Sequence, residues 1–301
     1  MMIKKAKPLL VFFICLNAIC QEPIEPDWKD LNYAGDGESY HTMDIYLPTS
    51  DSKKSPLILT IYGSAWRSNR SKASKYIKTS LIKPLVEAGF AVASINHRSS
   101  TDALFPAQIH DVKAAIRFLR GNAKEYKIDP TFVGVTGSSS GGHLAAMAGT
   151  TSHNKMMEGN VGSFLDYNSH VNAVVDWFGP TDFLLMDICG SRMVHDAINS
   201  PESKLIGGAI QENKKHAIAA NPITYISSET PPFLIIHGMV DLTVPYCQSK
   251  VLKIALDSAK IQSELISVRD GGHGRNVFKE EFQNKMVMFF KKELNKSLVN
   301  E

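Results

Sequence analysis

The amino-acid sequence predicts an α/β fold in which a single domain carries a mostly parallel sheet with helices on both faces. Its 301 residues are 44% hydrophobic and 21% charged, a normal composition for a large domain with a substantial core. Short runs rich in Val, Ile and Leu alternate along the chain with segments of helical character. Such runs form parallel sheets buried on both faces, and these sheets hold ligands at the carboxyl ends of their strands.

Seven segments have the character of strands. The first alternates polar and apolar residues up to Pro48, which predicts an edge strand, and the runs 56–62 and 131–136 have the apolar character of buried strands. The seven segments are 41–47, 56–62, 90–96, 131–136, 171–178, 233–236 and 263–268. Helices are predicted over 72–88, 106–123 and 276–295, and the second begins with Pro106 because proline suits a first helical turn.

The first 20 residues have the organisation of a secretory signal peptide. Three lysines precede an apolar stretch, residues 9–16, that is too short to span a bilayer, and Ala18 and Cys20 suit a cleavage site. A lipoprotein anchor at Cys20 is the rival interpretation, but the preceding Ile19 is larger than that signal normally carries. We therefore expect an exported protein, periplasmic or secreted, with a lead-in over 21–39 and a catalytic domain over 40–297.

Charge gives no argument for a nucleic-acid partner, and no membrane span is predicted. The chain has 33 basic and 30 acidic residues, but removal of residues 1–20 would take away three lysines and no acid, leaving 30 of each. Of the four cysteines, Cys189 and Cys247 lie in the folded region. One disulfide and two isolated thiols both remain open for this pair.

The stretch from Gly137 to Gly141 is the strongest motif in the chain. It matches the Gly-x-Ser-x-Gly pattern of a nucleophile elbow, in which a serine is held in a strained turn between a strand and a helix. The residues before it are apolar and β-branched, and those after it, 144–148, are good helix formers. Of three consecutive serines only Ser139 has glycine two positions away on both sides, so Ser139 is the predicted nucleophile.

A serine hydroxyl needs a base to take its proton and an acid to orient that base. Asp241 follows the predicted strand 233–236, and His273 lies in a glycine-rich loop after the last predicted strand. The chain order serine, aspartate, histidine is the order of an α/β-hydrolase triad. We therefore predict Asp241 as the acid and His273 as the base, and we take the other histidines, His237 among them, as structural.

Backbone N–H groups must hold the oxyanion that such a reaction forms. The N–H of Ser140, directly after the nucleophile, is one candidate, and those of Ser64 and Ala65 after an early strand are the others. The candidates for the substrate pocket are Tyr62, Gly63, Trp66 and His143. Trp66 would alternatively pack beneath its loop, and His143 would alternatively pack or cap at the start of the elbow helix.

Together these residues resemble the α/β-hydrolase esterase and lipase group related to hormone-sensitive lipase and to the Bacteroidetes ferulic acid esterase domain (BD-FAE). The similarity extends over residues 40–294 and includes GFAVASINHR at 89–98, FPAQIHDVKAAIRFLR at 105–120 and GPTDF at 179–183, besides the elbow. The resemblance implies the α/β-hydrolase fold and hydrolysis of carboxylic esters by Ser139, Asp241 and His273. It also suggests an ion pair between Arg98 and Asp111.

The chain departs from the group's pattern in one place. Where the oxyanion loop of the group usually has His-Gly-Gly-x-Trp, this chain has Tyr62-Gly63-Ser64-Ala65-Trp66. A serine in place of glycine restricts φ, and the tyrosine changes the hydrogen bonds that brace the loop. Catalytic efficiency and acyl preference are therefore the properties most affected.

The expected function is an exported serine carboxylesterase that acts on small-molecule or polysaccharide-linked esters and needs no cofactor or metal. Acetyl and feruloyl groups are suggested by family analogy. A serine peptidase of the prolyl-oligopeptidase type is one alternative, although such enzymes usually carry a large gating domain for which this chain is short. A hydrolase-like binding module with an impaired oxyanion loop is the other. The segment 181–198 is a candidate lid, and its Asp187, His195 and Asp196 have no standard metal-ligand spacing.

Overall fold

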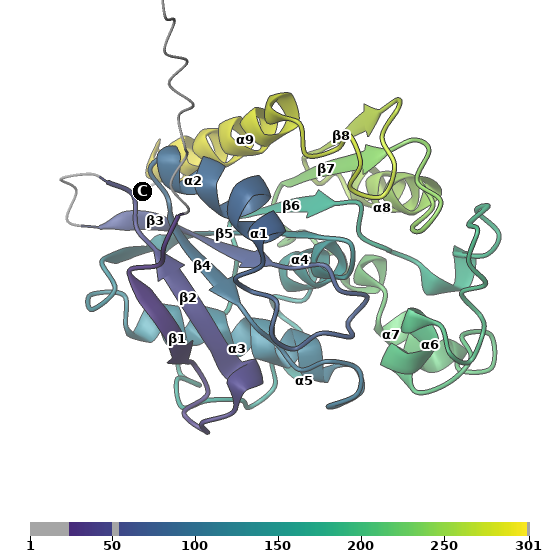
Figure 1. The fold of residues 1–301 in the computed structure, drawn as a ribbon, viewed down its shortest axis with the longest axis horizontal. Helices are drawn as coiled ribbons and strands as arrows, with labels where there is room; N and C mark the ends of the chain where they lie inside the picture. The colour runs from purple at the N-terminus through teal and green to yellow at the C-terminus, as the bar shows by residue number, and fades with distance from the viewer. Residues whose placement is uncertain (1–23, 50–53, 300–301) are drawn as a thin grey trace, which may run out of the picture.

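The computed structural model describes residues 24–49 and 54–299, which form one eight-stranded sheet with helices on both sides (Figure 1). The strand order is β1-β2-β4-β3-β5-β6-β7-β8. Neighbours from β4 to β8 pair in parallel, whereas β1 pairs with β2 and β2 with β4 in antiparallel fashion. The strands are β1 (Trp28–Asn32), β2 (Thr42–Tyr46), β3 (Ser55–Ile61), β4 (Ala91–Ile95), β5 (Ile128–Ser138), β6 (Ala173–Trp177), β7 (Phe233–Gly238) and β8 (Ser263–Val268). The predicted α/β fold with a mostly parallel sheet is confirmed.

Each face of the sheet carries its own hydrophobic core, because successive side chains of a strand point to opposite faces. In β3, Leu57 and Leu59 pack into the core under α3 (Ala107–Gly121), α4 (Ser140–Thr150) and α8 (Cys247–Ser258). Ile58, between them, packs on the other face under α1 (Lys75–Ile77), α2 (Lys83–Glu87) and α9 (Glu280–Val299). The sheet is thus buried on both faces, as its apolar strands require.

The connection between β6 and β7 is long and mostly irregular, and it forms the green segment at the right of Figure 1. Its short helices are η3 (Phe183–Leu185), α6 (Pro201–Ile206), α7 (Lys214–Ala219) and η4 (Pro222–Tyr225). Elsewhere η1 (Ser39–His41) precedes β2, and α5 (Lys155–Glu158) follows α4. A disulfide between Cys189 and Cys247 joins the long connection to the start of α8, which settles the state of these two cysteines.

The edge of the sheet differs from the sequence prediction. The strand at one edge is β1, with β8 at the other edge, and β1 lies inside the segment expected to be a lead-in, so the folded domain begins by Trp28. The segment expected at the edge is β2, an interior strand that is buried over most of its length. The alternation was misleading because Asp44 is a core residue, held by the ammonium group of Lys72.

The helix predicted over 72–88 is divided into three pieces. Between α1 and α2 lies a π-helical turn, η2 (Lys78–Ile82), and Pro84 follows it at the start of α2. Proline has no N–H to continue a regular helical ladder, so the α-helical hydrogen-bond pattern is interrupted here. The predicted ion pair is confirmed: the guanidinium group of Arg98 lies 2.6 Å from the buried carboxylate of Asp111.

Two predictions concern the membrane and the N-terminus. None of the helices within the described residues is both long enough and apolar enough to cross a bilayer. The predicted signal peptide, residues 1–20, lies outside the described residues.

Candidate active site

The motif residue Ser139 stands in a sharp turn between the last residue of β5 and the first residue of α4. Its backbone has φ 53° and ψ −124°, a conformation that a residue with a side chain adopts only when its surroundings enforce it. Here its N–H donates to the carbonyl of Trp177 at 2.8 Å, and its own carbonyl accepts from His143 N–H at 3.0 Å. The turn is therefore held from a neighbouring strand and from the helix that follows.

The glycines of the motif are required by space. A Cβ atom at Gly137 would lie 2.3 Å from the carbonyl oxygen of Gly141, and one at Gly141 would lie 2.2 Å from that of Ile61. These distances are far below van der Waals contact, so a larger residue at either position would force the turn open. The structure thus explains the spacing from which Ser139 was predicted.

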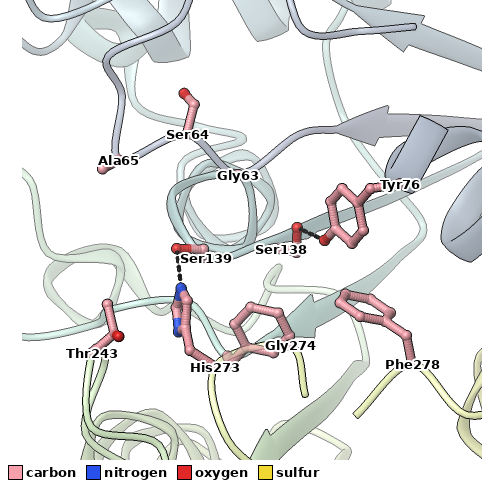
Figure 2. Close-up of a pocket in the computed structure, with 11 residues that line it drawn as sticks. Gly63, Ser64, Ala65, Tyr76, Ser138, Ser139, Thr243, His273, Gly274 and Phe278 are labelled. Atoms are coloured by element: carbon pink, nitrogen blue, oxygen red, sulfur yellow. Dashed lines mark hydrogen bonds between the residues drawn. The ribbon is translucent and has the colours of Figure 1, made fainter. Parts of the chain in front are cut away.

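The side chains of Ser139, His273 and Asp241 form one hydrogen-bonded chain across three loops. The Oγ atom of Ser139 lies 3.0 Å from Nε2 of His273, and Nδ1 of the same ring lies 2.8 Å from Oδ2 of Asp241. Figure 2 shows the serine hydroxyl directed at the imidazole ring. A donor and an acceptor on opposite sides of one imidazole are the arrangement in which the ring can take a serine proton.

Asp241 is buried and its carboxylate is fully surrounded by donors. Oδ1 accepts the N–H groups of Thr243 at 2.8 Å and Val244 at 3.0 Å, while a second ring, that of His237, lies 3.4 Å from Oδ2. Burial alone would raise the pKa of Asp241, but the hydrogen bonds from His237 and His273 outweigh it and hold that pKa well below its ordinary value. The group therefore stays an anion that can orient His273 and stabilise its protonated form.

His237 is more than the structural filler that the sequence suggested. It is the residue before the end of β7, four positions ahead of Asp241, and its other contacts are Ser249 Oγ at 2.6 Å and the Val244 carbonyl at 3.0 Å. These contacts fix the ring beside the acid. Its position at a strand end was the available signal for this role.

The loop that faces the elbow approaches it closely. A Cβ atom at Gly63 would lie 2.6 Å from the Ser138 carbonyl oxygen and 2.9 Å from the Cβ of Ser139. Ala65 and Trp66 have φ values of 54° and 53°, whereas Ser64 is not among the described residues with positive φ. The backbone strain that was expected at Ser64 therefore lies at Ala65 and Trp66 instead.

The three predicted oxyanion donors do not have equal status. The N–H of Ser64 donates to the side-chain oxygen of Ser140 at 2.9 Å, so it is already engaged, contrary to the sequence prediction. Ala65 lines the pocket beside Ser139, and within the described residues nothing accepts a hydrogen bond from its N–H. Ser140 is the first residue of α4, and N–H groups in a first helical turn have no partner within the helix. Ala65 and Ser140 are thus the available donors.

The hydrogen-bonded chain opens into a pocket of about 400 Å³. Its lining residues are Gly63, Ser64, Ala65, Tyr76, Ser138, Ser139, Phe178, Thr243, His273, Gly274 and Phe278. One side is an aromatic wall in which Phe178, Phe278 and Tyr76 pack edge to face in sequence, with ring centroids 5.5 Å and 5.1 Å apart. Figure 2 shows Tyr76 and Phe278 together on this side, with the tyrosine hydroxyl bonded to Ser138. Phe178 also packs against the ring of His273 at 4.9 Å.

The sequence did not reveal this wall. Phe178 directly follows β6, so its place at the carboxyl end of a strand was a usable signal. Tyr76 and Phe278 come from distant parts of the chain, and nothing in their local sequence points to the pocket.

Three of the four pocket candidates lie elsewhere. Tyr62 is buried, donates to the Ser68 carbonyl at 2.9 Å and stacks on His97. Trp66 is buried beneath the loop, where it meets the rings of His143 and Phe183. Large aromatic residues gain more from full burial than from a wet pocket, which explains both positions. Of the four, Gly63 alone lines the pocket.

His143, the fourth candidate, is also buried. Its Nε2 lies 2.7 Å from the carbonyl oxygen of Ala220, and burial lowers the pKa of His143 to about 4. The ring is therefore neutral near pH 7 and donates this proton to the carbonyl, so it ties α4 to the long connection.

The candidate lid packs on the loop that carries Asp241. The N–H of Arg192 and the hydroxyl of Ser191 both donate to the carbonyl of Leu242 at 3.1 Å, and no residue of 181–198 lines the pocket. Asp187 binds the backbone N–H groups of His195 and Asp196 at 2.6 Å and 2.9 Å. Within the described residues no group of three metal-ligating side chains is formed.

The fold and this constellation define the class of the protein: it is an α/β-hydrolase with a serine at the strained turn between β5 and α4. The chain matches the BD-FAE family over residues 43–256 and belongs to that family. Esterase LipQ of Mycobacterium tuberculosis is 30% identical over 77% of this chain and 53% of its own length. The chain spans about half the length of this relative and of a second one, the probable carboxylic ester hydrolase LipM of the same organism.

Two solved structures are more similar. A truncated carbohydrate esterase from gut microbiota is 43% identical, with a TM-score of 0.85 over 91% of this chain and 98% of that one. A bifunctional GH43-CE protein of Bacteroides eggerthii is 46% identical, with a TM-score of 0.84 over 88% of this chain and 35% of that one.

Proposed function

We propose that the protein is a serine carboxylesterase in which Ser139, His273 and Asp241 form the catalytic triad. The observation that carries the proposal is the hydrogen-bonded chain from Ser139 through His273 to Asp241, in a strained elbow that opens on a pocket. The names of the relatives, which are esterases and carboxylic ester hydrolases, support the same reaction.

The reaction follows from the geometry. Ser139 Oγ attacks the ester carbonyl carbon while its proton passes to Nε2 of His273, and the N–H groups of Ala65 and Ser140 hold the oxyanion. Collapse of the tetrahedral intermediate breaks the bond to the alcohol oxygen, which takes the proton from His273. Water then attacks the acyl-enzyme in the same manner, and the acid is released as Ser139 regains its proton. Asp241 stabilises the imidazolium at each stage. Every bond change is supplied by side chains and water, so the cycle needs no cofactor.

The proposed substrates are esters on carbohydrate. The two solved structures at 43% and 46% identity are described as a carbohydrate esterase and as a GH43-CE protein, which supports an acylated polysaccharide or oligosaccharide. Both acyl groups suggested from the sequence, acetyl and feruloyl, suit the pocket. Its volume of about 400 Å³ exceeds the needs of an acetyl group, and the wall of Tyr76, Phe178 and Phe278 offers ring contacts to an aromatic acyl group.

We also propose that the protein is exported. The pattern of residues 1–20 supports cleavage by a signal peptidase, and the disulfide between Cys189 and Cys247 supports an oxidising compartment, where such bonds persist. The cleavage site before Gln21 is checked by N-terminal sequencing of the protein recovered from the periplasm or the medium of its host. An intact N-terminus on cytoplasmic protein would contradict this proposal.

The esterase proposal is tested with a hydrolysis panel of acetylated xylan, a feruloylated sugar and p-nitrophenyl esters from two to twelve carbons. Wild type is compared with Ser139→Ala and, as a matched control, with Ser258→Ala on the exposed face of α8. Loss of the nucleophile should lower kcat by about 10⁶-fold or to background. Undiminished turnover in Ser139→Ala would end the proposal, and a wild type inactive on every ester would favour the binding-module alternative.

A further inference from the structure

We infer that the hydroxyl of Ser140 is a positioning group that holds the oxyanion loop, residues 62–66, in its working conformation. This role deepens the proposed function and rests on it. The hydroxyl belongs to the residue after the nucleophile and is buried, and it reaches across to the loop to accept the N–H of Ser64 at 2.9 Å.

The loop needs such a restraint because its own conformation is unfavourable. Ala65 and Trp66 are consecutive residues with positive φ, 54° and 53°, and neither is glycine. A left-handed conformation costs an ordinary L-residue about 1–2 kcal/mol. The turn that these two residues form is closed by the bond from Arg67 N–H to the Ser64 carbonyl at 3.0 Å, but this bond lies within the loop and does not fix the loop's position over the elbow.

The ends of the loop are held by contacts that do not involve the elbow. At its start, the hydroxyl of Tyr62 donates to the carbonyl of Ser68 at 2.9 Å, and the ring stacks on His97. At its end, Trp66 is buried, and its carbonyl accepts the N–H of Ser100 at 2.7 Å. These contacts fix where the loop begins and ends but not the height of its middle above Ser139.

The middle of the loop rests on the elbow at two points. Gly63 meets the elbow backbone so closely that a Cβ atom would lie 2.6 Å from the Ser138 carbonyl oxygen. The bond from Ser64 N–H to the Ser140 hydroxyl is the second point, and it is a directional one. The close approach stops the loop from moving inward, and the hydrogen bond stops it from moving outward.

Ser140 thereby sets the spacing of the oxyanion donors. One donor is its own N–H, and the other, the N–H of Ala65, directly follows the peptide that its hydroxyl holds. Donors in an oxyanion hole act when they lie about 2.7–3.1 Å from the oxygen that becomes negative. If the loop moved outward, the donors would stabilise the transition state less, whereas ground-state binding of the ester would be almost unchanged.

The test uses Ser140→Ala, which removes the hydroxyl and keeps the backbone N–H. Thr150→Val is the matched control, because Thr150 is a buried residue of the same helix whose hydroxyl donates within that helix, to the carbonyl of Ala146. Both variants are assayed on p-nitrophenyl acetate, and both are titrated with a trifluoromethyl ketone, which bonds to a serine Oγ and places its own oxygen in the oxyanion position. Fluorophosphonate labelling counts the sites that remain reactive.

For Ser140→Ala we expect kcat to fall about tenfold or more, with KM changed by less than about twofold and the ketone bound more weakly by the same factor as kcat/KM. Thr150→Val should keep wild-type values in all three. An unchanged kcat in fully labelled Ser140→Ala would overturn the inference. So would a higher kcat, which would mean that the hydroxyl competes with the oxyanion for Ser64 N–H. Failure of the proposed function is distinct, because wild type would then neither hydrolyse esters nor take up the label.

Discussion

Asp176 lets the stability of this fold be predicted as a function of pH. It lies on β6 beneath the first turn of α4 and is completely buried. Oδ1 accepts the N–H of Gly179 at 2.9 Å, while Oδ2 has no hydrogen-bond partner among the described residues. Burial raises the pKa of Asp176 from 3.8 to about 7, opposed only in part by the Gly179 bond. The folded protein therefore keeps this carboxyl protonated under conditions in which the unfolded chain has lost the proton.

The sign of the effect follows from this difference. Below about pH 4 both states are neutral at Asp176 and the group adds no pH dependence. As the pH rises from about 4 to 7, the unfolded chain ionises and the folded state does not, so the free energy of unfolding falls. Above about pH 7 both states are ionised and the loss is complete. Taking 3.8 and about 7 as the two pKa values, with about 1.36 kcal/mol for each pH unit, the loss is at most about 4 kcal/mol.

The substitution Asp176→Asn removes this titration and keeps an oxygen for the Gly179 bond. Urea unfolding, followed by tryptophan fluorescence from pH 4 to 8, gives the free energy of unfolding of wild type and variant. Relative to wild type, the free energy of unfolding of the variant should rise by up to about 4 kcal/mol between pH 4 and pH 8. A difference between the two proteins that is the same at every pH does not affect this comparison. Asp166→Asn, at an exposed aspartate, is the control and should follow wild type. Parallel curves for wild type and Asp176→Asn would refute the reasoning.

Three further predictions concern the oxyanion loop, the disulfide and the acid of the proposed triad. Gly63→Ala places a Cβ atom 2.6 Å from elbow backbone, so kcat should fall about 10²-fold or more with far-UV circular dichroism unchanged; near-normal activity would show that the loop can retreat at no cost. Replacing Cys189 and Cys247 by serine removes a disulfide between residues 58 positions apart, and the free energy of unfolding in urea should fall by about 2–4 kcal/mol. A fall of less than about 1 kcal/mol would contradict this prediction. Asp241→Asn keeps the acceptor for two backbone N–H groups but loses the anion, so kcat should fall about 10³–10⁴-fold, and a fall of less than about tenfold would deny Asp241 its role.

The parts of the site that could be predicted are those with a signature in local sequence. The elbow requires glycines at fixed spacing because a Cβ atom at Gly137 or Gly141 has no room, so its pattern is visible in the chain. Asp241 and His273 each follow an apolar strand in the expected order, and parallel strands bring their carboxyl ends to one edge of the sheet. The interior strands were found for the same reason.

The parts that escaped prediction depend on contacts between distant residues. Asp44 has the polarity of a surface residue, and it is a core residue because distant groups, the Lys72 ammonium and the Asp30 N–H, bind its carboxylate. The state of Ser64 could not be foreseen, because the strain lies at Ala65 and Trp66 and the Ser64 N–H is held by a hydroxyl 76 positions away. Sequence patterns report what a residue prefers, and such long-range partners decide what it does.

Ser139, and neither of its serine neighbours, is the proposed nucleophile. Labelling with a fluorophosphonate, followed by tandem mass spectrometry of the peptide that contains Ser138, Ser139 and Ser140, tests it most directly. We expect one adduct for each chain, located on Ser139, with loss of ester hydrolysis in proportion to labelling. No adduct, an adduct on another residue, or hydrolysis that survives complete labelling would contradict it.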